Sequence, residues 1–328
     1  MTTVKIVKEE DFKKRLDIFL VQHLENKYPR AKISAYIDEG NVNVNSKKQK
    51  SSYKLKLNDL IEFDENYMES FLNPSEELIP WDYKLDIKYE DDDVIVLNKP
   101  KEMLVHPTKF EREKTLVNAL ISYCGNNLSD IGGKNRLGIV HRLDKNTSGL
   151  MLVCKNNASH KILAEEIRLK TAKRKYLALA LVNFKENEKK EGIIDKPLVH
   201  YLQNDVKMKI AEKGEGLEAL TLYKVVEEFK GCSLVELELK TGRTHQIRAH
   251  LASIGHPVFG DSLYGAKSYM RNEFYNLKTI EQLLQSYYLS FYHPKTNELM
   301  EFQLEEKDFS KDFIKVLNFL RSKNENQS

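Results

Sequence analysis

The feature that most constrains the fold is the run GLMLVC at residues 149–154, in which no side chain is polar or charged. Runs of this kind form strands that are buried on both faces of a sheet. The polar stretch VHRLDKNTS stands directly before it, at residues 140–148. We therefore expect Asp144 to lie on a loop held against a rigid core, where catalytic groups are often found. The alternative is that Asp144 only caps a turn, as isolated aspartates near Thr-Ser-Gly commonly do.

The distribution of charge predicts how the chain is divided. Residues 1–63 contain 13 Lys and Arg against 9 Asp and Glu, whereas residues 64–93 contain 2 against 11. A chain of 328 residues is long enough for two domains. We expect a basic front domain at 1–63, an acidic linker at 64–83, a larger domain at 84–310, and a C-terminal helix and tail at 311–328.

The cysteines and the N-terminus indicate a soluble cytoplasmic protein. Cys124, Cys154 and Cys232 are odd in number and far apart, which argues against a disulfide framework. Charged residues occupy the first 17 positions where a signal peptide would be apolar, and no run approaches the length of a membrane span. We expect no membrane association.

The front domain shows helical and then strand-like spacing. Apolar residues at helical intervals predict one helix over 12–24 and a second that stops at Gly40, before the alternating stretch of Val42 and Val44. Composition alone leaves open a generic module whose lysines are merely solvated.

A second polar stretch, KTGRTHQIRAHLASIGHP at residues 240–257, predicts a helix with an anion site at its start. Thr244 is suited to the N-cap, Ile247 and Leu251 begin an apolar stripe, and Gly255 ends the helix. Arg243 would stand directly before the helix N-terminus, where either a phosphate or a protein carboxylate is favoured. If the anion is Asp144, Arg243 orients it.

The same stretch contains His245, His250 and His256, but a zinc site is not expected. On a helix His245 and His250 are five positions apart rather than the three or four that align two ligands, and no third ligand is evident. We therefore predict no metal site.

Tyr176 follows Lys173, Arg174 and Lys175 at the start of an apolar strand. Many strands carry an ordinary edge tyrosine of this kind. An aromatic ring beside cations is also the arrangement that stacks exposed bases and holds their phosphates.

Taken together, GIVHRLDKNTSGLMLVCK, AKRKYLALALV and TGRTHQIRAHL with GHPVFGDSLYG resemble the RluA-type pseudouridine synthases, from about Leu85 to Phe302. Residues 12–63 resemble the small S-four-type RNA-binding domain, although Pro29 and Arg30 stand where Ser-Arg is frequent. The layout is similar to the ribosomal large-subunit members of D type. The resemblance implies an α+β protein: a small N-terminal S-four-type RNA-binding domain followed by a mixed-sheet catalytic domain.

The resemblance also implies the function and its residues. The expected reaction converts specific uridines to pseudouridine in structured RNA, with 23S ribosomal RNA as the expected substrate and no cofactor or metal. Asp144 would be the catalytic carboxylate, Tyr176 would stack on the target base, and Arg243 would pair with Asp144. Arg142 would fill the space left by the flipped nucleotide, and His141 would have a supporting role. The remaining RNA-binding candidates are Arg30, Lys32, Lys47, Lys48, Lys173, Arg174 and Lys175.

Three alternatives stay open. One is a catalytically inactive RNA-binding or ribosome assembly protein, the second a synthase acting on tRNA, and the third a nucleoside or glycoside hydrolase, for which no second acid is apparent. Departures from the family pattern at Tyr287 and Tyr288, and the absence of an arginine-rich segment at 197–210, indicate that some RNA contacts differ. We expect a monomer.

Overall fold

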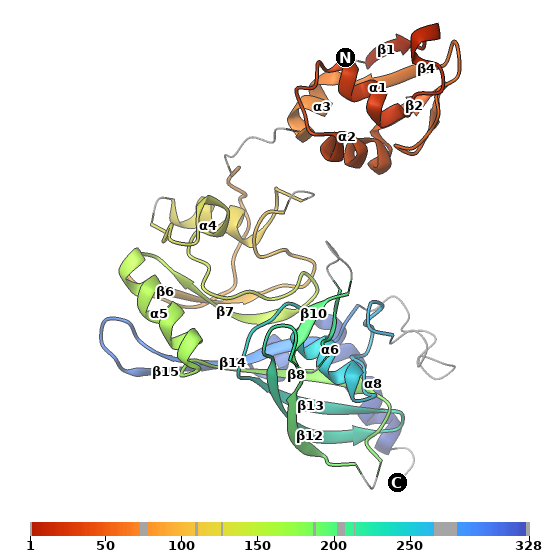
Figure 1. Cartoon of the computed structure of the whole chain (residues 1–328). Coiled ribbons are helices and arrows are strands. Elements are labelled where there is room, and N and C mark those ends of the chain that lie inside the picture. Colours follow the sequence, from red (N-terminus) through yellow and green to blue (C-terminus); the bar gives the residue numbers. More distant parts are fainter. Residues whose placement is uncertain are drawn as a thin grey trace. The chain divides into compact units, whose positions relative to one another are not determined.

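A computed structural model describes the chain over residues 2–72, 78–108, 111–125, 127–185, 188–201, 207–212, 214–265 and 281–325. It divides into two compact units, which we call the front unit, residues 1–77, and the main unit, residues 78–328. In Figure 1 the front unit is coloured red to orange, and the main unit continues through yellow and green to blue.

The front unit is a four-stranded antiparallel sheet with three helices. The strands pair in the order β1-β4-β2-β3. Its elements are β1 (Thr2–Ile6), η1 (Glu9–Asp11), α1 (Leu16–His23), α2 (Arg30–Tyr36), η2 (Ile37–Asn41), β2 (Val42–Val44), β3 (Lys47–Lys48), β4 (Leu60–Asp64) and α3 (Glu65–Leu72). The helices and sheet enclose a separate apolar core that includes Leu20, Ile33 and Ile61. The two predicted helices and the strand after Gly40 are therefore confirmed as elements, although the first helix begins at Leu16 instead of residue 12. Elements β1 and α3 were not expected.

The acidic linker predicted over residues 64–83 is wrong in its extent. Helix α3 packs Met68 and Leu72 into the core of the front unit. At the other end, Trp81 packs against the apolar core of the main unit, and its backbone N–H donates to the Asn118 carbonyl at 3.0 Å. Trp81 therefore anchors this segment to the main unit, and both ends of the predicted linker belong to the folded units.

The main unit is built on a nine-stranded mixed sheet (Figure 1). The order is β5-β6-β7-β14-β8-β13-β12-β9, with β15 paired to β14, and β7 runs parallel to β14. The strands are β5 (Ile87–Glu90), β6 (Val94–Lys99), β7 (Ser148–Cys154), β8 (Lys173–Leu181), β9 (Glu191–Asp195), β12 (Leu220–Phe229), β13 (Cys232–Leu239), β14 (Leu284–Tyr292) and β15 (Leu299–Gln303). A separate pair joins β10 (Leu198–His200) to β11 (Met208–Ile210).

Helices cover both faces of this sheet, because its central strands are apolar on both sides. Alternate residues of β7 enter two different cores: Leu150 and Leu152 enter one, and Met151 and Val153 the other. The first core is closed by α5 (Asn157–Leu169) and α8 (Lys311–Glu325), and the second by α4 (Leu116–Cys124) and α6 (Gln246–Ser253). The short helices are η3 (Lys134–Arg136) and η5 (Glu306–Asp308). The C-terminal helix is thus confirmed as an element, and it is part of the main unit's core.

Gly149 allows β7 and β14 to lie side by side. Its φ is +124°, and a Cβ atom placed there would be 2.0 Å from the Ser286 carbonyl oxygen. Only glycine avoids this clash with backbone. The glycine of the NTSGL stretch therefore fixes the strand that begins four residues after Asp144.

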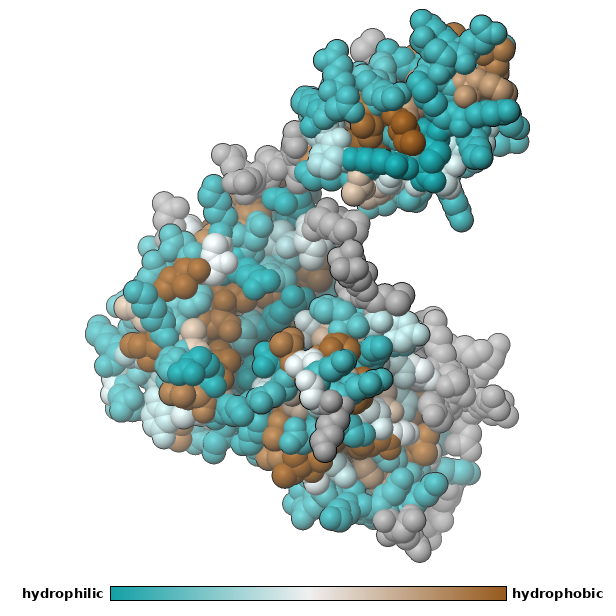
Figure 2. All heavy atoms as spheres, viewed as in Figure 1, coloured by the Kyte–Doolittle hydropathy of each residue, from teal (hydrophilic) through white to brown (hydrophobic). Residues whose placement is uncertain are grey.

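Figure 2 shows hydrophilic side chains over most of the face in view, with apolar side chains in small groups. None of the helices in the described parts of the chain is long and apolar enough to cross a membrane.

Candidate active site

Asp144 lies in a tight turn directly before the buried strand β7. The Thr147 N–H donates to the Asp144 carbonyl at 3.1 Å, and the neighbouring Leu143 side chain is buried in the core. The Asp144 side chain keeps 17% of its surface exposed. The expectation of a carboxylate on a loop against a rigid core is confirmed.

Arg248 on α6 holds the Asp144 carboxylate. Its Nη1 donates to Asp144 Oδ2 at 2.9 Å, while its Nε and Nη2 form a fork on Asp261, at 2.7 and 3.0 Å. Asp261 is fully buried. Burial alone would lower the pKa of Arg248, but the hydrogen bonds and charges of Asp261 and Asp144 raise it above its usual value. Arg248 therefore remains a cation shared between two carboxylates.

The predicted pairing of Arg243 with Asp144 is wrong. Helix α6 begins at Gln246, with His245 at the N-cap in a left-handed conformation, so Thr244 is not the cap. The Gln246 side-chain oxygen accepts the Arg243 backbone N–H at 3.0 Å. The turn folded in this way sends the Arg243 guanidinium to the Glu218 carbonyl, at 2.9 Å from Nε. Arg248, in the first turn of the helix, takes the place expected for Arg243.

Sequence reasoning missed both Arg248 and Asp261. A signal was present for Asp261, which follows the apolar segment PVFG at residues 257–260. A carboxylate buried in such a segment needs a cation partner. Arg248 lies between Ile247 and Ala249, which are both buried in the structure.

Tyr176 and Arg174 project from the same face of β8. Along this strand Arg174 and Tyr176 are buried, at 6% and 3% exposure, while Lys173 is exposed and Lys175 half-buried. This alternation follows from the two-residue period of a strand. Burial is the main cause that raises the pKa of the Tyr176 phenol, so it stays protonated at neutral pH. The three cations before Tyr176 are therefore separated, with Arg174 alone on the tyrosine's side.

Lys175 has partners on the opposite face of the sheet. Its ammonium lies 3.6 Å from a Glu236 carboxylate oxygen and 5.5 Å from the centre of the Tyr288 ring. The Tyr287 hydroxyl donates to Glu236 and the Tyr288 hydroxyl to Glu301. The two tyrosines that depart from the family pattern are thus engaged with carboxylates.

A cleft brings the candidate residues together. An inner pocket of about 50 Å³ is lined by Asp144, Tyr176 and Arg248 with apolar walls from Leu239, Ile247 and Leu284. A larger groove of about 500 Å³ shares Asp144 and Tyr176 with it and carries many cations. The basic side chains of this groove are Arg136, Arg142, Arg168, Lys170, Arg174, Lys240 and Arg243. The arrangement can hold an anionic polymer along the groove and a planar group against Tyr176.

Arg142 is exposed in this groove, as its predicted contact with RNA requires. Its Nη1 lies 3.4 Å from His106 Nε2. Burial, with the charges of Arg142 and Arg136, lowers the pKa of His106 to about 4. His106 is therefore neutral at physiological pH and places no competing charge beside Arg142.

Lys99 supports the Asp144 loop from behind. It is completely buried, and its ammonium donates to the carbonyls of Pro100, Met103 and Lys145, at 2.7, 2.9 and 3.2 Å. Lys145 is the residue after Asp144. Burial lowers the pKa of Lys99 to about 7, and the Asp144 carboxylate opposes that shift. The loop therefore depends on a buried amino group that donates to three carbonyls and whose charge is disfavoured by burial.

Replacing Lys99 should destabilise the protein. In Lys99→Met three carbonyls lose a donor, and we expect the free energy of unfolding to fall by about 2 kcal/mol. The pKa of Lys99 is about 7 in the folded protein and has its ordinary value of 10.5 in the unfolded chain. Between these two pH values the unfolded chain therefore binds more protons than the folded protein. The wild type should therefore gain stability relative to Lys99→Met as the pH rises from 7 to 10. Urea unfolding at several pH values measures both effects, with the exposed Lys145→Met as control. Equal stability of the three proteins at every pH would contradict this account.

The three histidines of the stretch at residues 240–257 have hydrogen-bond partners within the protein. The His245 imidazole hydrogen-bonds to the Tyr264 hydroxyl. The His250 imidazole bonds to the Thr221 hydroxyl and the Lys196 carbonyl, and the His256 imidazole bonds to the Val182 carbonyl. In the parts of the chain that are described, the one group close enough to share a cation is Asp91, Asp93 and His293.

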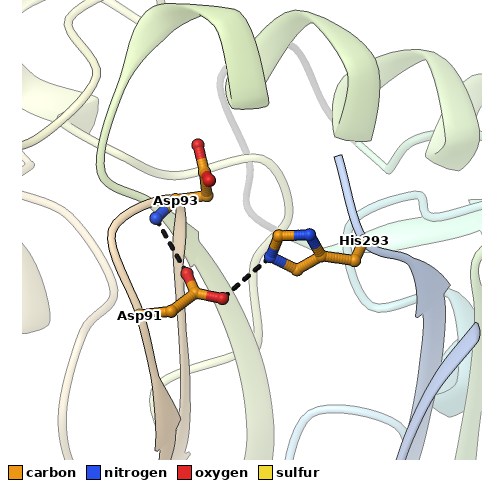
Figure 3. Close-up of side chains that lie close together, drawn as sticks. All are labelled: Asp91, Asp93 and His293. Carbon is orange, nitrogen blue, oxygen red and sulfur yellow. Dashed lines mark hydrogen bonds and ion pairs between the residues drawn. The ribbon is translucent and has the colours of Figure 1, made fainter. Parts of the chain in front are cut away.

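Hydrogen bonds within the protein already occupy that group (Figure 3). His293 Nε2 lies 2.8 Å from Asp91 Oδ2, and its Nδ1 accepts the Thr296 N–H at 3.2 Å, so Nε2 is the donor. Asp93 accepts the Ser159 hydroxyl at 2.7 Å. Through these hydrogen bonds the cluster joins the turn at Asp91 and Asp93 to the turn at His293 and to the start of α5.

Of the four residues of the front unit predicted to contact RNA, Arg30 and Lys32 have partners within the protein, whereas Lys47 and Lys48 are exposed on a hairpin. Arg30 and Arg15 both pair with Asp17, at 2.9 Å, and these hydrogen bonds overcome the effect of burial to lower the pKa of Asp17 to about 2. Lys32 donates to the Leu72 carbonyl at 2.9 Å. Lys47 and Lys48, on the β2–β3 hairpin, are exposed. The hairpin lysines are therefore the stronger candidates for phosphate contacts among these four predicted residues.

The sequence of this chain is similar to those of known proteins over most of its length. The model of the RNA pseudouridylate synthase family matches residues 93–253. The uncharacterized RNA pseudouridine synthase YlyB of Bacillus subtilis is 36% identical over 316 residues, which are 95% of this chain and 96% of that protein. The ribosomal large subunit pseudouridine synthase D of Zymomonas mobilis is 40% identical over 227 residues, 69% of this chain and 70% of that protein.

A solved structure agrees with the fold. The human RNA pseudouridylate synthase domain containing 4 superposes with a TM-score of 0.54, over 72% of this chain and 92% of its own, at 23% identity. This likeness confirms the predicted mixed-sheet fold of the main unit. The residues that match the family model, 93–253, include the HRLD loop, β8 and α6, which together build the cleft. On this evidence the chain is a member of the RNA pseudouridine synthase family.

Proposed function

We propose that this chain converts uridines to pseudouridine in large-subunit ribosomal RNA, with Asp144 as the catalytic carboxylate. The observation that carries the proposal is the position of Asp144. Together with Tyr176 it lines both the inner pocket and the basic groove, and Arg248 holds its carboxylate at 2.9 Å. The relative from Zymomonas mobilis, which is named for the ribosomal large subunit, supports the choice of RNA.

The reaction needs a positioned carboxylate and no change of oxidation state. The bond from ribose C1′ to uracil N1 breaks, the base turns, and a bond forms from C1′ to C5, while C5 loses a proton and N1 gains one. Asp144 can attack the sugar, attack the base, or remove a sugar proton. In each route Arg248 keeps one carboxylate oxygen occupied and leaves the other for the substrate.

The neighbouring residues have separate roles in this proposal. The Tyr176 ring offers a stacking face for uracil, and Arg142 is exposed where it can enter the space left by the flipped nucleotide. Arg243, although not paired with Asp144, lines the inner pocket and the groove and contributes positive charge near the substrate. The front unit binds a second region of the RNA as an S-four-type domain, and the protein works as a cytoplasmic monomer.

Mapping of pseudouridine tests this proposal directly. The purified chain is incubated with unmodified large-subunit ribosomal RNA and, in parallel, with unmodified tRNA. We expect new pseudouridines at a few positions of the ribosomal RNA. Modification of tRNA alone would support the tRNA-specific alternative instead, and tight binding without any modified base would support an inactive RNA-binding protein.

The two hairpin lysines should contribute to affinity more than to turnover. In Lys47→Gln/Lys48→Gln we expect RNA binding to weaken by about tenfold at physiological salt, with a salt dependence shallower by roughly two counterions. The turnover number at saturating RNA should stay within about twofold. The matched control is Lys161→Gln/Lys189→Gln, which removes two exposed lysines from the main unit. A larger loss in turnover than in affinity would show that the hairpin acts elsewhere.

A further inference from the structure

Arg174 is a buried arginine that has no counterion among the residues that the structure describes. Its side chain is 6% exposed, and its Nε has no hydrogen-bond partner. Within the described part of the chain, no hydrogen bond or ion pair involves its guanidinium. Leaving a buried guanidinium without an anion is unfavourable, and unsatisfied groups of this kind in folded proteins call for an explanation. Arg248, buried to the same extent, is held by two carboxylates.

His141 provides a second donor without a partner beside Arg174. Its Nε2 accepts the Leu152 backbone N–H at 3.0 Å, so the proton of the neutral ring is on Nδ1. That Nδ1 is buried and has no partner among the described residues. Burial, together with the charge of Arg174, lowers the pKa of His141 to about 3, which keeps the ring neutral. Two independent N–H donors, one of them charged, thus line the same groove.

The position of these donors relative to Tyr176 limits what they can bind. Arg174 precedes Tyr176 by two residues on the same face of β8, which separates their Cα atoms by roughly 6.5 Å. Gly242 also lines the groove, and a Cβ atom there would be 3.0 Å from Arg174 Nη1. The guanidinium therefore lies at the wall of the groove beside a residue without a side chain, and along β8 it is offset from the stacking ring by about the length of one nucleotide.

We propose that Arg174 and His141 form a subsite for one backbone phosphate of the RNA, adjacent to the nucleotide whose base lies against Tyr176. This inference rests on the proposed function and extends it to the register of the RNA in the groove. A phosphate supplies the negative charge that the buried guanidinium lacks, and its oxygens accept from a guanidinium fork and a neutral imidazole together. A free phosphate ion offers the same chemistry, so the test separates the two sources.

The first arm uses RNA in which single linkages are neutral. A short hairpin that the protein modifies is prepared with one methylphosphonate, placed in turn on either side of the target uridine. At one position we expect the dissociation constant for the wild type to rise about 10- to 100-fold. The Arg174→Met variant should bind the unmodified hairpin more weakly by a similar factor. Its affinity should fall almost no further when that methylphosphonate is present. Additive losses at both positions would overturn the subsite.

Lys173→Met is the matched control, because Lys173 is exposed on the opposite face of the same strand. Lys173→Met should lose less affinity for the unmodified hairpin than Arg174→Met does. Each methylphosphonate should then weaken the binding of Lys173→Met by the same factor as it weakens the binding of the wild type. Coupling for Lys173 equal to that for Arg174 would attribute the effect to general charge and contradict the proposal.

The second arm uses inorganic phosphate and needs no activity. At constant ionic strength, replacing chloride by phosphate should raise the Tm of the wild type and of Lys173→Met more than that of Arg174→Met. Without phosphate, Arg174→Met should be at least as stable as the wild type, because it removes a buried, unpaired charge. An equal rise for all three proteins would overturn the subsite. If the chain forms no pseudouridine in any RNA, the proposed function fails, whereas this arm still decides whether Arg174 binds phosphate.

Discussion

Asp144→Asn should abolish pseudouridine formation while leaving the protein folded and able to bind RNA. The amide has nearly the shape of the carboxylate and can still accept a hydrogen bond from Arg248, so the loop keeps its position. It cannot act as nucleophile or base, and we expect the rate to fall by about 10⁴-fold or more. The dissociation constant for RNA should change by no more than a few-fold.

Single-turnover kinetics with excess enzyme measure this effect without interference from product release. Asp92→Asn is the control, since Asp92 is an exposed aspartate of the same unit, outside the cleft. A rate for Asp144→Asn within tenfold of the wild type would remove Asp144 from the chemistry, whatever the control shows.

Arg248→Met should be far more damaging than Arg243→Met. It leaves the fully buried Asp261 and the partly buried Asp144 without a cation, and removing one partner from a buried ionic group costs about 3–5 kcal/mol. Activity should fall with it, because Asp144 is no longer held. Arg243 is exposed and donates only to a backbone carbonyl, so Arg243→Met should lower RNA affinity with little change in stability.

Urea unfolding and turnover measured on the same preparations compare the two arginines. Arg248→Lys keeps a charge without the fork on Asp261 and should lie between the wild type and Arg248→Met in stability, which provides a folded variant if methionine is not tolerated. A larger loss of stability in Arg243→Met than in Arg248→Lys would contradict the ion-pair geometry described above.

The fold class followed from the family resemblance, and the positions of Asp144 and Tyr176 could be predicted because they depend on local patterns. The apolar run at residues 149–154 determines a buried strand, and the turn before it must then lie at the edge of the core. The two-residue period of β8 likewise separates Arg174 and Tyr176 from Lys173 and Lys175, although the four had been considered as one group.

The choice between Arg243 and Arg248 could not be made from spacing. It depends on the left-handed conformation of His245 and on Gln246, which bonds to the Arg243 N–H and to the Leu220 carbonyl on β12. The contact with Leu220 is tertiary and joins residues distant in the sequence, and a helix N-cap rule based on Thr244 contains neither this contact nor the turn at His245.

The missed helix α3 has a different cause. Its acidic residues suggested a solvated linker, but Met68, Phe71 and Leu72 are spaced i, i+3 and i+4 and pack against the front core. The acidic composition of this segment favoured a linker, although the stripe of three apolar residues indicated a helix. The boundary between the two units therefore lies after this helix instead of before it.

Release of tritium from RNA labelled at uracil C5 tests the central claim most directly. Formation of the new carbon–carbon bond expels the C5 hydrogen, and the account predicts one tritium in water for each pseudouridine formed by the wild type, and none from Asp144→Asn. Release of free uracil with its tritium retained, or equal tritium release by Asp144→Asn, would contradict it.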